Sequence, residues 1–155
     1  MTTDNQKNFN EILAALTAAL GCEPLSPEED GRVLFALDDN LGCALFPFDA
    51  EEAGNDGVMA SLVVGPVPPD NTELLWDLLT GNYMGAEAGA GTLSIERESG
   101  MLVVSRPFDL PIDAAAFVEA FASLAGAARA WRDRLAVVAG DVQEEAHSVG
   151  DFMRV

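Results

Sequence analysis

The chain has 155 residues, with 26 Asp and Glu against 8 Lys and Arg and a formal net charge of −18. This length is typical of one domain, and a 49% share of hydrophobic residues is too high for a disordered chain. The acidic balance argues against binding to nucleic acid or anionic lipid, because both depend on basic contacts. It keeps a small protein soluble, and it also attracts basic or aggregation-prone partners.

The sequence contains no run of about 18 apolar residues, so no transmembrane helix and no membrane insertion are expected. The first residues are polar and lack the pattern of a signal peptide, so we expect a cytoplasmic protein. Cys22 and Cys43 are too few for a disulfide framework, and both are expected to be buried. With His147 as the one histidine, no metal site is expected.

The first part of the chain predicts a helix and three strands. Helical spacing of apolar residues indicates a helix over 4–20, with Thr3 as its cap and Gly21 as its stop. Strands follow over 32–37, 41–48 and 58–64, separated by a turn at 38–40 and an acidic loop over 49–57. Neighbouring strands joined by short loops should pair as an antiparallel meander.

A second helix is expected over 71–82, and it is apolar around much of its circumference. Its apolar residues are Leu74, Leu75, Trp76, Leu78 and Leu79. A helix of three turns with so much apolar surface must be covered on more than one side. One side can face the sheet of the same chain, and a second copy of the chain is the simplest cover for the other.

The last part predicts a strand hairpin, over 92–96 and 101–107, and a final helix over 114–139 whose apolar seam packs across the sheet. Asp113 is its expected N-cap. Beyond Gly140 the sequence is mixed and polar, so residues 1–140 are expected to form one domain and 141–155 a flexible tail. The order helix, three strands, helix, two strands, helix predicts an α+β fold with an antiparallel sheet packed against helices.

No motif points to catalysis, a cofactor or a metal. The glycine-rich segment over 85–91 follows a helix and leads into a strand, whereas a phosphate loop follows a strand and opens a helix. The paired carboxylates at 38–39 lie in a turn, where water keeps them ionised. Arg129, Arg132 and Arg134 are expected to pair with acids near the end of the last helix.

The second half of the chain carries a series of short structural motifs. It reads Leu-Leu-Trp-Asp-Leu-Leu-Thr-Gly-Asn-Tyr from residue 74, then the glycine-rich segment, then Gly-Thr-Leu-Ser-Ile-Glu and Ser-Gly-Met-Leu-Val-Val-Ser-Arg. The series continues with Leu-Pro-Ile-Asp-Ala and ends with Ala-Arg-Ala-Trp-Arg-Asp-Arg-Leu at residue 135. It resembles the type III secretion chaperone family (the CesT-like, or Tir-chaperone, group), and the first half agrees in element order. The 49–57 loop and the residues beyond Gly140 are the least family-like parts.

The resemblance implies a non-catalytic, ATP-independent chaperone that binds the extended N-terminal segment of a secreted effector as a homodimer. A surface that holds a chain extended needs apolar pockets and free sheet edges. For the dimer contact we predict four residues of the second helix and its end: Leu75, Trp76, Leu79 and Tyr83. For client binding we predict six apolar residues: Leu13, Leu16, Phe35, Leu45, Phe46 and Phe48.

Two other functions remain open at this level. An acidic inhibitor or immunity-type protein would use the negative charge to mask a basic site on a folded partner. A small hydrolase or ligand-binding domain would require a deep polar pocket. Salt separates the first of these from a chaperone, because binding by charge weakens with ionic strength and apolar binding persists.

Overall fold

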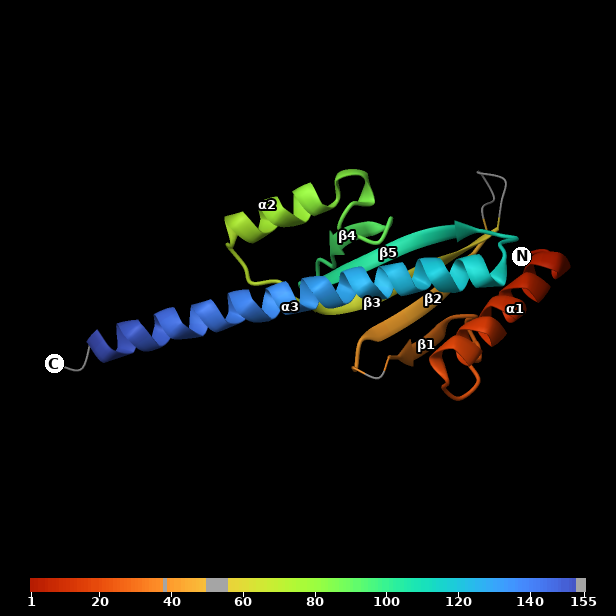
Figure 1. Ribbon diagram of the computed structural model, residues 1–155, viewed down its shortest axis with the longest axis horizontal. Coiled ribbons are helices and arrows are strands. Elements are labelled where there is room, and N and C mark those ends of the chain that lie inside the picture. Colours follow the sequence, from red (N-terminus) through yellow and green to blue (C-terminus); the bar gives the residue numbers. More distant parts are fainter. Residues whose placement is uncertain (38, 50–55, 153–155) are drawn as a thin grey trace.

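The structure is a computed structural model that describes residues 1–37, 39–49 and 56–152 (Figure 1). Its elements follow the order helix, three strands, helix, two strands, helix, which confirms the predicted α+β class. Residue 38 of the first predicted turn, residues 50–55 of the acidic loop and residues 153–155 lie outside the described residues.

A five-stranded antiparallel sheet forms the centre of the molecule. Its strands are β1 (Val33–Ala36), β2 (Gly42–Phe48), β3 (Gly57–Pro66), β4 (Thr92–Ile95) and β5 (Met101–Asp109). The order across the sheet is β1-β2-β3-β5-β4, so the meander and the β4–β5 hairpin both form as predicted. β5 pairs with β3, which leaves β1 and β4 as the two edges.

Two helices, α1 (Thr3–Leu20) and α3 (Ala114–Phe152), pack against each other, and α3 lies on β3 and β5 as its apolar seam predicts (Figure 1). The shorter α2 (Thr72–Gly81) contacts β4, and a single 3-10 turn, η1 (Tyr83–Gly85), follows it. The helices therefore cover one face of the sheet. Among the described residues, no helix covers the other face, which we call the helix-free face.

The core lies between the helices and the covered face of the sheet. Along β3 every second side chain is buried, in the order Val58, Ala60, Leu62 and Val64. Successive residues of a strand point to opposite faces, so this alternation separates the core face from the helix-free face. The α3 side chains that meet the core are spaced by three and four residues: Phe117, Phe121, Leu124, Ala128, Trp131 and Leu135.

Polar side chains begin the helices, with one difference from the prediction. The cap of α1 is Thr2 and not Thr3, since the Thr2 hydroxyl accepts a hydrogen bond from the Asn5 amide at 3.3 Å. Asp113 caps α3 as predicted, accepting from the Ala116 amide at 2.9 Å. Each cap satisfies a backbone donor that has no partner within the helix.

The last helix is longer than predicted. It was expected to end near residue 139, yet its backbone remains helical to Phe152 and extends beyond the sheet (Figure 1). Gly140 costs only about 1 kcal/mol relative to alanine inside a helix, which is too little to end one. The division into a domain over 1–140 and a flexible tail over 141–155 stays a prediction.

The glycine-rich segment after α2 packs directly against the core elements. A Cβ on Gly89 would lie 2.6 Å from the Ser123 carbonyl oxygen of α3, and one on Gly91 would lie 2.4 Å from that of Ser105 in β5. These glycines therefore allow close backbone approach. The indole of Trp131, also on α3, donates to the Glu87 carbonyl oxygen at 2.9 Å and so holds the segment against the same helix.

Arginines of α3 pair with acids, as predicted. Arg129 and Arg132 both donate to the carboxylate of Asp39 in the β1–β2 turn. These two guanidinium groups hold the pKa of Asp39 well below its usual range. Arg134 pairs with Glu87, and its guanidinium lies 4.5 Å from the Trp131 ring centroid.

Candidate interaction surfaces

The second helix and the 3-10 turn η1 that follows it carry the most exposed apolar side chains of the described chain. Asn71 caps the helix by accepting from the Leu74 amide at 2.9 Å, and Leu74 and Leu78 are buried against the sheet. The exposed fractions on the other side are 41% for Leu75, 69% for Trp76, 70% for Leu79, 74% for Tyr83 and 87% for Met84. We call these five side chains the α2 patch.

The α2 patch contains all four residues predicted for the dimer contact: Leu75, Trp76, Leu79 and Tyr83. The sequence predicts that α2 has more apolar surface than its own sheet can cover. The structure leaves this surface in contact with solvent, whereas soluble monomers normally expose apolar side chains singly. Whether a second copy covers it stays a prediction.

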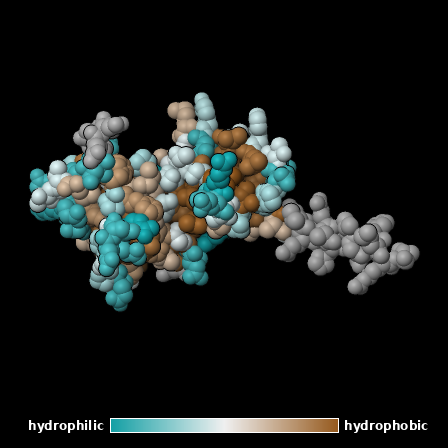
Figure 2. All heavy atoms as spheres, turned by 180° about the vertical axis from the view of Figure 1, so that it is seen from behind, coloured by the Kyte–Doolittle hydropathy of each residue, from teal (hydrophilic) through white to brown (hydrophobic). Residues whose placement is uncertain are grey.

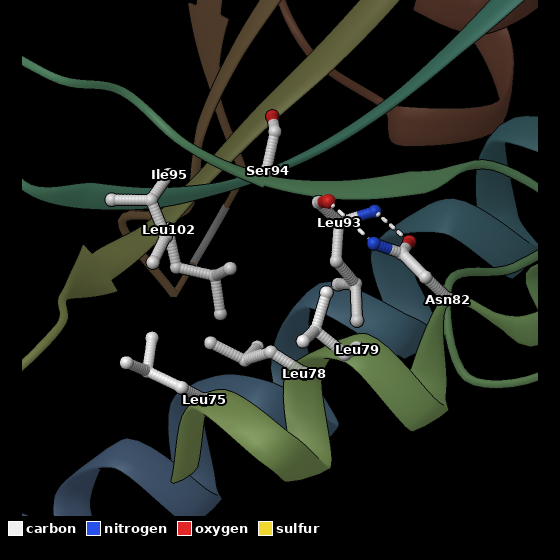
Figure 3. A pocket seen from close by; sticks show the side chains of 8 residues that line it. All are labelled: Leu75, Leu78, Leu79, Asn82, Leu93, Ser94, Ile95 and Leu102. Carbon is white, nitrogen blue, oxygen red and sulfur yellow. Dashed lines mark hydrogen bonds between the residues drawn. The ribbon is translucent and has the colours of Figure 1, made fainter. Parts of the chain in front are cut away.

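An apolar pocket of about 300 Å³ opens between α2 and β4 (Figure 3). Leucines of α2 form one wall and residues of β4 and β5 the other: Leu75, Leu78, Leu79, Leu93, Ile95 and Leu102. Leu78, Leu93 and Leu102 are buried and form its floor, whereas Leu79, at 70% exposed, lies at its rim. We call this cavity the α2–β4 pocket.

Asn82 fixes the distance between the two walls of the pocket. Its amide nitrogen donates to the Leu93 carbonyl oxygen at 2.8 Å, and its amide oxygen accepts from the Leu93 amide at 2.6 Å (Figure 3). The side chain thus pairs with β4 as a neighbouring strand would, and covers part of its free edge. With this amide occupied, the pocket offers few polar groups and suits an apolar occupant.

The helix-free face of the sheet is a second apolar surface. Phe46 and Phe48 of β2 are half-buried and alternate with side chains that point into the core. Phe46 lies beside Met59 of β3 in the strand register, and Val63 on the same face of β3 is 42% exposed. From the side opposite to that of Figure 1, apolar surface gathers over α2 and the adjacent strands, with hydrophilic side chains around it (Figure 2).

The residues predicted for client binding do not form one surface. Leu16 and Leu45 are 1% and 0% exposed, so they belong to the core and present no surface to a client. Leu13 is buried but also lines a cleft between α1 and the loop over 22–27. Phe35 is half-buried and packs on Phe121, with ring centroids 5.8 Å apart.

Phe46 and Phe48 are therefore the predicted client residues that lie on an uncovered face. Met84, Ile95, Val63 and Leu34 are exposed apolar residues that were not among the predicted interaction residues. Strand alternation was the available signal for Leu34 and Val63, because each lies one residue away from a buried position.

Most positive charges of the described chain are engaged by acids of the same chain. Arg32 pairs with Asp30, and its hydrogen bonds lower the pKa of Asp30. The arginines of α3 pair with acids as described above, so the remaining acids dominate the surface at a net charge of −18. No helix in the described part of the chain is both long and apolar enough to cross a membrane.

The two cysteines differ, contrary to the expectation that both are buried. Cys43 is buried in β2, and burial raises its pKa to about 12. Cys22 is exposed because it follows the left-handed Gly21 that ends α1, outside the core.

Comparison with known proteins gives the family. The model of the Tir chaperone protein (CesT) family matches residues 11–132. This chain belongs to that family. The match covers all five strands, α2 and most of α1, so it includes both apolar surfaces described above.

Solved structures of type III secretion chaperones share the fold. This chain is similar to the ExsC–ExsE complex, with a TM-score of 0.67 at 17% identity over 87% of this chain and 97% of that one. It is also similar to the HopA1–SchA chaperone–effector complex, with a TM-score of 0.63 at 18% identity over 86% and 98%. The third similar structure is the Yersinia pestis type III secretion chaperone SycH in complex with a fragment of YscM2. Here the TM-score is 0.60 at 15% identity over 79% of this chain and 98% of that one. Among curated proteins, no sequence matches the chain.

Proposed function

We propose that this protein is a non-catalytic, ATP-independent chaperone of type III secretion that acts in the cytoplasm as a homodimer. It binds the N-terminal segment of a secreted effector and holds that segment extended. The observation that carries the proposal is that a member of the Tir chaperone family leaves two apolar surfaces uncovered, the α2 patch and the helix-free face of its sheet.

The two surfaces have separate roles in this proposal. The α2 patch gathers the predicted dimer residues on one short helix and the turn after it, which suits an isologous contact in which both copies use the same surface. The helix-free face offers apolar side chains, including Phe46 and Phe48, together with a sheet edge at β1 for an extended client. Two of the similar solved structures are complexes with a second protein, one a chaperone–effector complex and one a chaperone with a fragment of YscM2.

The net charge supports the same function, because a charge of −18 opposes aggregation of a protein with exposed apolar surface. The charge also favours the second candidate, an acidic inhibitor of a basic enzyme. The two candidates differ in their response to salt. At 1 M salt the Debye length is about 3 Å, so binding by charge should be lost and apolar binding retained.

The test is binding of the N-terminal segments of proteins encoded beside this chain in its genome, measured by calorimetry at low salt and at about 1 M salt. We expect one segment to bind at both salt concentrations and to remain sensitive to protease outside the bound region. Phe46→Asp should weaken this binding by tenfold or more, since a charge would replace an apolar contact. A folded basic protein that binds only at low salt would favour the inhibitor instead.

The matched control is Val137→Asp, which introduces the same charge at a 64% exposed position on α3, away from both surfaces. It should leave client binding unchanged. Light scattering tests the homodimer, and Trp76→Glu should yield monomers that still fold, because this side chain is exposed in the single chain. An unchanged dimer would remove Trp76 from the contact.

A further inference from the structure

We infer that the two copies of this chain interlock, with Trp76 of each copy filling the α2–β4 pocket of the other. The inference rests on the proposed homodimer and specifies how its two surfaces fit together. It follows from the presence of a protruding side chain and a matching cavity on one surface.

The protruding side chain is Trp76. It is 69% exposed on the side of α2 away from the buried Leu74 and Leu78. The cavity lies on the adjacent side of the same helix, between Leu75 and Leu79 of α2 and the strand β4. Its volume of about 300 Å³ is at the small end of ligand pockets, which suits one large side chain better than a metabolite.

The chemistry of the cavity also suits an indole. Its floor consists of Leu78, Leu93 and Leu102, and the amide of Asn82 is held by the Leu93 backbone (Figure 3). An aromatic side chain buries about 150–250 Å² when it becomes enclosed, so two indoles would supply a large share of the association free energy. Tryptophan is also enriched among the residues that contribute most to interfaces.

Symmetry favours a second copy of this chain as the occupant. In a two-fold contact, residue i of one copy meets residue j of the other and the reverse, so one protrusion and one cavity on the same surface satisfy each other twice. Such a contact closes after two copies, whereas a protrusion and a cavity on different faces would continue into a ring or a filament.

The exposed apolar area around α2 is also large enough for a dimer interface. The α2 patch and Ile95 are exposed by 41–87%, and three of these six residues, Leu75, Leu79 and Ile95, line the pocket itself. Six side chains of this size present on the order of 800 Å², which is the area each partner buries in an interface of standard size.

Tryptophan fluorescence of the wild-type chain gives the first test. Trp131 is 1% exposed, so the neutral quencher acrylamide reports on Trp76. On dilution through the dimer dissociation range, quenching should rise several-fold and the emission should shift to longer wavelength. Light scattering follows the oligomeric state in the same samples.

Paired variants give the second test. Trp76→Ala removes the protrusion, and Leu75→Phe adds a ring to the wall of the pocket. Each variant alone should raise the dimer dissociation constant by tenfold or more. Mixed together they should form a heterodimer more tightly than either forms a homodimer, because one intact Trp76 then meets one open pocket.

Each outcome decides the inference. Shielding of Trp76 in the dimer together with preferred heterodimers supports it. A dimer in which acrylamide reaches Trp76 as in the monomer overturns it and leaves the proposed homodimer standing. Shielding that appears only when an effector segment is added overturns it too, since the pocket would then serve the client. A chain that stays monomeric at all concentrations overturns the homodimer itself.

Discussion

Gly89→Ala is expected to destabilise the fold by about 2–5 kcal/mol. Gly89 has a φ of +59°, a region where an L side chain costs about 1–2 kcal/mol. The added Cβ would also lie 2.6 Å from the Ser123 carbonyl oxygen and 2.8 Å from the Leu124 nitrogen. Both neighbours are backbone atoms of α3, so no side-chain rotation can relieve the contact, and overpacking of this kind costs about 1–3 kcal/mol.

The matched control is Gly100→Ala in the β4–β5 turn. Gly100 has a similar φ of +68°, but an added Cβ would meet nothing within 4 Å. The free energy of unfolding of the Gly100→Ala variant should therefore fall only by the cost of the left-handed backbone conformation, about 1–2 kcal/mol. Urea unfolding followed by circular dichroism measures both variants, at one protein concentration because association shifts the midpoint. Equal losses for Gly89→Ala and Gly100→Ala would refute the close packing of the glycine-rich segment on α3.

Two further predictions concern titratable groups. Arginine pairing holds the pKa of Asp39 below its ordinary value of 3.8, so its carboxylate stabilises the fold above about pH 4 and less as the pH falls through the lower folded pKa. Asp39→Asn should therefore lower the urea midpoint at pH 7 but much less at about pH 2, and an equal loss at both pH values would contradict the pairing. Burial raises the pKa of Cys43 to about 12, so this thiol should not react in the native protein. Ellman's reagent should therefore label the exposed Cys22 quickly in the native protein and label both thiols only after unfolding. Rapid labelling of two thiols in the native protein would contradict the burial of Cys43.

Element order was predictable because each element has its own period and its own end signals. The seam of α3 repeats at three and four residues, and Gly21 ends α1 with a left-handed residue. Exact ends were less predictable. Thr2 and Thr3 can both cap a helix, and only the tertiary position of the chain before α1 decides between them. Beyond Gly140 the mixed, polar sequence predicted a tail, yet α3 continues to Phe152, since polar residues on all sides do not by themselves end a helix and one glycine costs only about 1 kcal/mol.

The distinction between core and surface depends on facts that the sequence does not contain. Leu45 and Phe46 are adjacent in β2, so they point to opposite faces and cannot both line one groove. The alternation along the strand places Leu45 and Phe46 on opposite faces of the sheet. Which of these two faces the helices cover is decided by how α1 and α3 pack. The uncovered apolar surface of α2 was predictable, because a short helix with apolar residues on most sides cannot bury all of them on one sheet.

The exposure of the α2 patch is fixed by specific contacts, and a simple rotation of the helix would not remove it. Asn71 caps the start of α2, and at its end Asn82 makes two hydrogen bonds to the backbone of β4. Rotation would break the pairing with Leu93 and would leave that backbone amide and the Asn82 side chain without their partners. Beyond Asn82, the glycine-rich segment is held against α3 by close backbone contacts and by Trp131. The contacts at the C-terminal end of α2 therefore fix its orientation and keep a large apolar surface outward, as a binding surface requires and a monomer core does not.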